Sequence, residues 1–307
     1  MKKYLLSFGV LAAVALSMTS CLSNSSSDQK YTFSYGNSDC FNRVYDMETQ
    51  QYTITEKPSY SFVYNVSKGT VNVDMSNIKL GDSGYAGMSF KLTDLTFKGA
   101  TDGFWVTTAT DVIPYGADQS YIFNNFNLRA LPGRTIGNGS IPVYYMTYLI
   151  NNRYRVTVCP TQYVYFGTIN ATDIENQKIF TITNDKETYY AVQIDPTKMK
   201  AKLIVFGAKY KEGMSRYNYL AQDLPVELTN TGYVIRTESG KDYPVYNEKS
   251  VTKPVEGQSI SNINIVGTIE TGANINFNCN LGDDGKFAVN ASLRYLLYNE
   301  QKPNQQQ

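Results

Sequence analysis

The sequence predicts an all-β protein built from two duplicated antiparallel domains, and three observations lead to this prediction. Residues that favour strands are abundant, with 26 tyrosines in 307 residues and frequent threonine, valine and isoleucine. Short segments of alternating apolar and polar residues follow one another between turn residues. Motifs of the first half recur in the second half. Alternation buries one face of each strand, which suits a β-sandwich or a barrel, and the domain size favours the sandwich.

The recurring motifs keep their order along the chain. KYTFSYG (30–36) resembles QYVYFG (162–167), and the later matches keep offsets between 126 and 137 residues. Chance similarity would not preserve both order and spacing, so we expect two related domains at 30–160 and 161–299. The later matches pair Thr53–Thr55 with Thr181–Thr183, Gly87–Ser89 with Gly213–Ser215, Asp94 with Asp223, Gly103 with Gly232, Pro114 with Pro244, and residues 123–128 with 260–265.

Each domain is expected to hold eight or nine strands. In the second copy the last two strands form a hairpin around Gly282 to Gly285, and in the first copy the corresponding turn is Asn151-Asn152. Both turns consist of residues that tolerate positive φ. The strands expected in the second copy are 162–167, 177–183, 188–194, 199–206, 224–228, 232–237, 260–269, 273–281 and 285–292.

The N-terminus has the pattern of an export signal. Lys2 and Lys3 precede an apolar stretch that is too short to span a bilayer, and small residues precede Cys21. Residues 1–20 with Cys21 resemble the lipobox signal peptide of bacterial lipoproteins. The resemblance implies that Cys21 becomes the first residue of the mature chain and carries acyl chains such as palmitate. Each buried methylene contributes about 0.8 kcal/mol to membrane binding, so Cys21 is predicted to be the membrane anchor.

The anchor implies a place in the cell envelope. Residues 21–29 contain too few apolar side chains to fold and read as a flexible tether, and residues 300–307 read as a disordered tail. We expect a lipid-anchored protein of the outer membrane. The residues after Cys21 do not indicate whether it faces the periplasm or the cell surface.

Charge and residue usage exclude several function classes. The formal net charge is +1, with 28 basic and 27 acidic residues, and no basic cluster stands out, so nucleic acid is not an expected partner. The chain contains no histidine. This excludes Ser-His-Asp and Cys-His catalysis and the usual histidine-ligated metal sites. We expect no cofactor and no metal.

Three cysteines remain after the anchor, and none forms a CxxC motif. Cys40, Cys159 and Cys279 are expected to be mostly small buried apolar residues. An exported chain can oxidise one pair, and a Cys40–Cys159 disulfide is the alternative that the sequence leaves open.

Aromatic residues are the candidates for ligand binding. Trp105 is the only tryptophan and opens a strand, and its repeat counterpart, Val234, favours a packing role. Tyr217 and Tyr219 lie in KYKEGMSRYNY (209–219), which has basic residues and no clear strand period, so we expect a loop there. Loops carry binding residues more often than scaffolds do. A glycan or another envelope protein is the partner that these rings would suit.

Carboxylates offer the one enzymatic alternative, a glycan hydrolase that uses two acids. No two acids are spaced in a way that pairs them. Asp94 and Asp223 occupy matched repeat positions, which a shared turn or cap explains more simply than catalysis does. The remaining candidates are Asp74, Asp102, Asp111, Glu187, Glu227 and Glu238.

These observations favour a cell-envelope lipoprotein that is not an enzyme and has a binding, adhesion or structural role. Duplicated modules on a tether can add reach or a second weak contact. The layout of signal, tether and two β domains also resembles that of fimbrillin-type pilus subunits, which implies a structural alternative. That likeness rests on layout and not on a motif.

Overall fold

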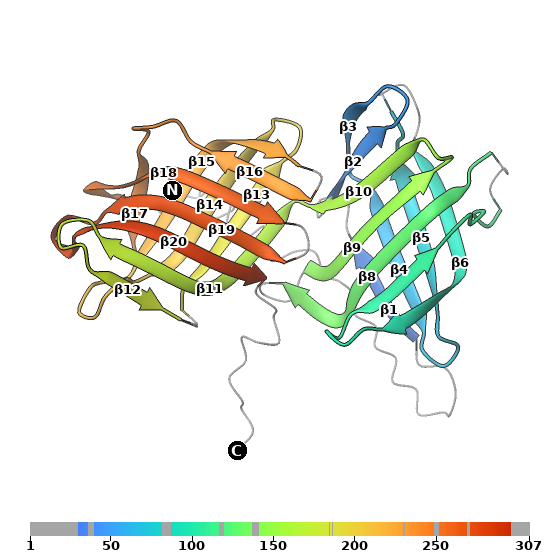
Figure 1. The fold of residues 1–307 in the computed structure, drawn as a ribbon, viewed down its shortest axis with the longest axis horizontal. Helices are drawn as coiled ribbons and strands as arrows, with labels where there is room; N and C mark the ends of the chain where they lie inside the picture. Colours follow the sequence, from blue (N-terminus) through green and yellow to red (C-terminus); the bar gives the residue numbers. More distant parts are fainter. Residues whose placement is uncertain are drawn as a thin grey trace, which may run out of the picture. The chain divides into compact units, whose positions relative to one another are not determined.

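A computed structural model describes residues 30–35, 40–81, 87–116, 120–136, 141–183, 185, 187–229, 231–248, 252–268 and 271–295. The chain divides into two compact units, residues 1–159 and 160–307, and in both units the described residues are all-β (Figure 1). Cys21, the expected tether and the expected tail lie outside the described residues. No helix among the described residues is long and apolar enough to cross a membrane.

The second unit is a closed barrel of eight antiparallel strands. Closure depends on one long strand, β11 (Gln162–Asp173), which is paired on both sides. Its first residues pair with β13, and residues 165–173 pair with β20. The barrel is completed in the order β13 (Tyr189–Asp195), β14 (Lys200–Ala208), β15 (Tyr217–Leu228), β16 (Gly232–Arg236), β18 (Pro254–Thr268), β19 (Gly272–Asn280) and β20 (Lys286–Tyr295).

Two further strands extend this barrel. β12 (Ile179–Ile182) pairs with β11 and stands at the end of the sheet order, and β17 (Tyr243–Asn247) pairs with β15 and β18. A short 3₁₀ turn, η2 (Gly282–Asp284), joins β19 to β20, and Gly282 and Gly285 both have positive φ, as the sequence predicts. The structure gives a barrel and not the favoured sandwich, because β11 pairs with both ends of the sheet.

The first unit is a curled sheet with the same strand order. Its strands run β1-β4-β5-β6-β7-β8-β9-β10-β2-β3. The roles of β11 are divided between β1, which pairs with β4, and β2, which pairs with β10 and β3. The strands are β1 (Lys30–Tyr35), β2 (Cys40–Asp46), β3 (Gln51–Glu56), β4 (Ser59–Asn65), β5 (Thr70–Ile78), β6 (Met88–Gly99), β7 (Trp105–Ala109), β8 (Phe123–Ile136), β9 (Ile141–Ile150) and β10 (Tyr154–Pro160).

Matched backbone irregularities show that the units repeat in detail. Asp94 and Asp223 both have positive φ, 55° and 57°, and both sit at a bulge, where the pairing with the neighbouring strand shifts. Asn77 (φ 55°) and Gly207 (φ 64°) occupy a second pair of matched bulges. Aspartate, asparagine and glycine are the residues that tolerate this conformation. Asp94 and Asp223 therefore recur for a shared backbone role, as the sequence favoured.

The hydrogen-bond registers also correct three of the repeat matches. Tyr52 and Ile179 occupy the same position after matched turns, so the match of Thr53–Thr55 with Thr181–Thr183 is one residue out of register. Met88 corresponds to Tyr217 and not to Met214. Trp105 lies opposite Ala130 as Tyr233 lies opposite Gly267, so the counterpart of Trp105 is Tyr233 and not Val234.

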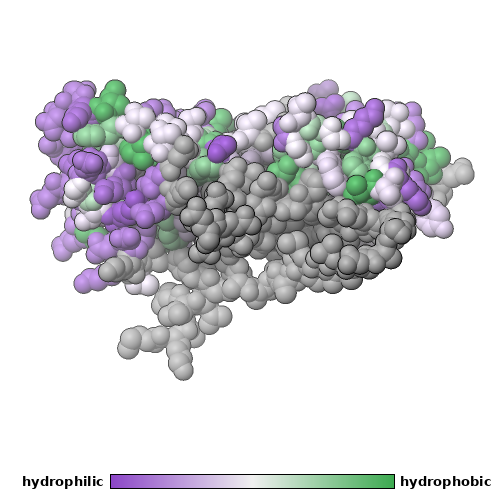
Figure 2. Space-filling model, turned by 90° about the horizontal axis from the view of Figure 1, so that it is seen from below, coloured by the Kyte–Doolittle hydropathy of each residue, from purple (hydrophilic) through white to green (hydrophobic). Residues whose placement is uncertain are grey.

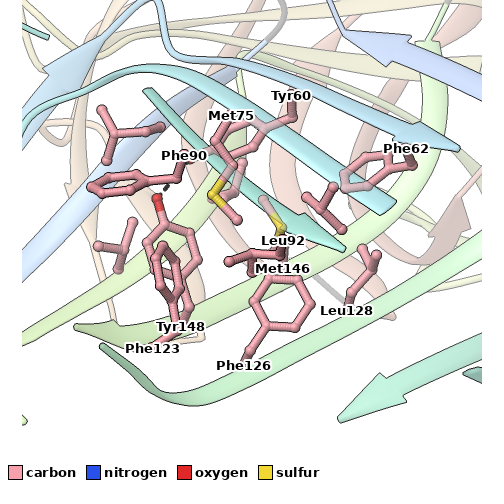
Figure 3. Packing of buried hydrophobic residues seen from close by; sticks show 14 of the residues in the cluster. Tyr60, Phe62, Met75, Phe90, Leu92, Phe123, Phe126, Leu128, Met146 and Tyr148 are labelled. Atoms are coloured by element: carbon pink, nitrogen blue, oxygen red, sulfur yellow. Dashed lines mark hydrogen bonds between the residues drawn. The ribbon is translucent and has the colours of Figure 1, made fainter. Parts of the chain in front are cut away.

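Aromatic and aliphatic side chains from alternate strand positions form the cores. In the first unit Tyr60, Phe62, Phe123 and Phe126 are fully buried, and the rings interdigitate with Met75 and Met146 of neighbouring strands (Figure 3). Three polar side chains meet in this core: the Tyr60 hydroxyl donates to Asn42 Oδ1 at 2.7 Å and lies 3.1 Å from the Tyr148 hydroxyl.

Candidate functional site

The tyrosines favoured for ligand binding lie in a strand and not in a loop. Tyr217 opens β15, and both Tyr217 and Tyr219 are buried. The Tyr217 hydroxyl donates to Asp284 Oδ2 at 2.7 Å, and the Tyr219 ring packs edge-on against Phe277 at 5.7 Å between centroids. The expectation of a loop is wrong from Tyr217 onward. The Tyr219 ring therefore takes part in core packing, and Tyr217 attaches β15 to the turn between β19 and β20.

The segment before Tyr217 is fixed to the barrel by a polar network. Arg216 Nη1 donates to Asp185 Oδ2 at 2.9 Å and to the Gly207 carbonyl at 2.6 Å, and Arg216 also forms an ion pair with Glu187. Met214 Sδ lies 2.9 Å from the Tyr210 backbone nitrogen. The pKa of Asp185 is lowered because hydrogen bonds from Arg216 and neighbouring groups outweigh the effect of its partial burial. These contacts indicate a structural attachment of residues 209–216.

Trp105 is a partly buried residue at the margin of the first core. Its ring stacks on Phe97, with 4.6 Å between centroids, and meets Tyr64 edge-on at 5.0 Å. Its counterpart Tyr233 is fully buried, and the Tyr233 hydroxyl lies 2.8 Å from that of Tyr165. The packing role that the sequence favoured agrees with these contacts.

The three cysteines among the described residues, Cys40, Cys159 and Cys279, are free and buried in the structure. Cys40 Sγ lies 3.7 Å from the Pro58 carbonyl oxygen, and Cys159 Sγ lies 3.8 Å from that of Thr157. Burial raises the pKa of the Cys159 and Cys279 thiols to about 12. A raised pKa makes a thiol unreactive at neutral pH, which fits the expected role as small apolar residues.

Several of the carboxylates considered for catalysis contact a cation or an amide, and Glu187 shares Arg216 with Asp185. Asp74 lies 3.8 Å from Lys91 Nζ, Asp102 accepts from Arg129 at 2.6 Å, and Asp111 accepts from Asn124 at 2.9 Å. Among the described residues, no group of three or more Cys, Asp or Glu side chains could hold a metal ion.

One hairpin in each unit has the same turn structure and exposes apolar side chains at the same positions in both copies. The sequence patterns did not predict these hairpins. We call them the β2–β3 hairpin (40–56) and the β11–β12 hairpin (162–182). Their turns are DMETQ (46–50) and DIENQ (173–177), and in each the first aspartate accepts two backbone N–H groups of the turn. The fifth turn residue, Gln50 or Gln177, has positive φ in both.

Each of these turns also contacts the last hairpin of its own unit, which is β9–β10 in the first unit and β19–β20 in the second. The Met47 N–H donates to the Arg153 carbonyl at 2.9 Å, as the Ile174 N–H donates to the Lys286 carbonyl at 2.9 Å. Arg153 pairs with Glu48 and Asp46, and Lys286 pairs with Glu175 at 3.5 Å. The hydrogen bond from Arg153 lowers the pKa of Asp46 to about 2. The turns are therefore fixed in place with their charges paired.

Both hairpins expose large apolar side chains at matched positions. Met47 and Ile174 are each 41% exposed, and Tyr52 and Ile179 are 44% and 64% exposed. On the face shown in Figure 2, hydrophobic residues appear as small separate groups among hydrophilic ones. Large apolar side chains that are exposed at equivalent places in both copies are the best candidates for contact with a partner. We therefore take the β2–β3 and β11–β12 hairpins as the candidate functional site.

Comparison with known proteins gave no match: no family model, no curated protein and no solved structure is significantly similar to this chain.

Proposed function

We propose that the chain is a lipid-anchored protein of the bacterial outer membrane that binds a partner and has no catalytic role. The anchor would be Cys21, acylated after removal of residues 1–20. The single observation that carries the binding role is the repeated hairpin, because two turns with the same capping hold matched apolar side chains in solvent. Two equivalent sites on one chain suit a partner that offers repeated contacts, such as a glycan or an assembled envelope protein.

The packing in both units supports a scaffold more than a reaction centre. Asp74, Asp102 and Asp111 are held by cations or amides, and Glu187 and Asp185 are both neutralised by Arg216. A two-carboxylate hydrolase needs two acids about 5 to 10 Å apart in one cleft. The described tyrosines with the most strongly raised pKa values owe this chiefly to burial in the cores. Groups that are perturbed by packing alone do not indicate catalysis.

Two measurements on cells that produce the full chain test the proposal. The wild-type chain should incorporate labelled palmitate, and the Cys21→Ser chain should not. Protease added to intact cells then distinguishes a surface location, in which the protein is lost, from a periplasmic location, in which it survives until lysis. Absence of label in the wild type, or equal label in the variant, would refute the anchor.

A further inference from the structure

Among the strands that the structure describes, none pairs with the outer edge of β12 on the second unit. This strand follows the turn of the β11–β12 hairpin, pairs with β11, and stands at the end of the order of described strands (Figure 1). Its four residues, IFTI, include no charge and no proline. An open strand edge presents main-chain donors and acceptors that another strand can pair with.

The matched strands β3 and β12 differ in which side chain a cation covers. The Arg43 guanidinium carbon lies 3.7 Å from the Tyr52 ring centroid, and β3 ends in Glu56. At β12 the cation is Lys178, whose Nζ lies 4.9 Å from the centroid of the Phe180 ring, so Ile179 is left uncovered. At the matched position of β12, Ile179 is 64% exposed, and Ile174 of the same hairpin is 41% exposed. Natural sheets protect edges with charged residues. The difference between the units therefore points to β12 as an edge kept open.

We propose that β12 of one copy pairs antiparallel with β12 of a second copy about a twofold axis. A strand edge is complementary to itself under that symmetry, so one segment supplies both sides of the contact. No charge within β12 opposes another across the pair. The formal net charge of +1 also gives little repulsion between copies. The exposed Ile179 and Thr181 of the two copies would then share one face of the joined sheet.

The contact is small, so its strength is expected to depend on concentration. A four-residue strand covers much less than the roughly 1,200 Å² of a stable interface, so the free chain should exist as monomer and dimer in fast exchange. Anchored copies would pair more readily because a membrane raises their effective concentration. The pairing itself does not depend on the proposed function and can be measured without the lipid.

The experiment adds one cysteine to the chain at a time, at matched positions: Thr181→Cys in β12 or Ile54→Cys in β3. Near the centre of an antiparallel pair the two cysteines would have Cα atoms about 4.5 to 5.5 Å apart, within the range of a disulfide. The full chain is oxidised in envelopes, with wild type as background. Thr181→Cys should give a disulfide-linked dimer several times more abundant than that of Ile54→Cys.

A second experiment tests the pairing of β12 without any added cysteine. The sedimentation coefficient of the purified wild-type chain should rise with concentration. Ile179→Lys places a charge on the open edge and should abolish this rise without a change in melting temperature. The matched Tyr52→Lys should leave that rise unchanged. Equal cross-linking of both cysteine variants, or a wild-type chain that stays monomeric at all concentrations, would overturn the proposal.

Discussion

Asp46 and Asp173 close the same turn in the two units. The Glu48 N–H donates to Asp46 Oδ1 at 2.9 Å, and the Glu175 N–H donates to Asp173 Oδ1 at 3.0 Å. Both carboxylates are stabilised in the charged form: hydrogen bonds from Arg153 lower the pKa of Asp46, and those from Asn176 lower the pKa of Asp173. The turn that presents the apolar side chains is thus maintained by charge and hydrogen bonding together.

Acid should weaken the first unit through Asp46. Its pKa falls from 3.8 to about 2 on folding, so its stabilising contribution is complete above pH 4 and is lost as the pH falls toward 2. In urea titrations between pH 2 and 6, wild type should lose stability over this range, and Asp46→Asn should be less stable than wild type at pH 6 and approach it at pH 2. A constant difference between the two proteins would contradict this assignment.

The matched bulges predict a backbone effect at two exposed positions. Asp94 and Asp223 have positive φ, which costs a β-branched residue about 1 to 2 kcal/mol and costs glycine almost nothing. Asp94→Val and Asp223→Val should each lower the free energy of unfolding by that amount, and Asp94→Gly and Asp223→Gly should leave it nearly unchanged. Equal effects of valine and glycine would show that the side chains matter and not the backbone.

Asn218 is predicted to be critical for one end of the barrel in the second unit. This buried side chain accepts the Gly207 N–H at 2.9 Å and donates to the Glu248 carbonyl at 3.0 Å. Asn218→Ala leaves these groups without their partner, so the free energy of unfolding should fall by about 1 to 3 kcal/mol. Asn127→Ala removes an exposed amide contact with Asn125 and should change it by less than about 0.5 kcal/mol. Denaturant titration of both variants checks the contrast.

Alkaline pH should destabilise both units through their buried tyrosines. Burial raises the pKa of Tyr165 and Tyr60 well above 10, the ordinary value. The unfolded chain releases these protons near pH 10 and the folded chain does not, so stability is complete below that pH and falls as the pH rises above it. Absorbance at 295 nm should show exposed tyrosines titrating near pH 10 and the buried ones ionising together with unfolding. Full ionisation at pH 10.5 with the fold intact would refute this.

The sequence predicts local backbone structure correctly where neighbouring residues determine it. Asn151-Asn152 was predicted as a turn, and both residues have positive φ, because asparagine tolerates that conformation wherever it occurs. The turns, the alternation and the order of the repeat could therefore be predicted.

Other features depend on residues that lie across the sheet. β17 and the first half of β15 were missed because their strand structure comes from pairing with other strands: β17 pairs with β15 and β18, and the first half of β15 pairs with β14 and β17. A shift of one residue reverses the two faces of a strand, and small insertions between the copies hid the match of Tyr52 with Ile179. The exposure of Ile179 likewise follows from the position of β12 at the end of the sheet, which no local pattern reports.

The thiols give the final prediction. Cys40, Cys159 and Cys279 are buried, and the pKa of both Cys159 and Cys279 is raised to about 12. A maleimide reagent at pH 7 should therefore leave all three unlabelled in the folded chain, because thiolate is scarce and access is blocked. In guanidinium without reductant all three should be labelled, as counted by mass spectrometry of the peptides. Labelling of Cys279 alone would instead establish a Cys40–Cys159 disulfide, and rapid labelling before unfolding would show that the cores open on the timescale of the reaction.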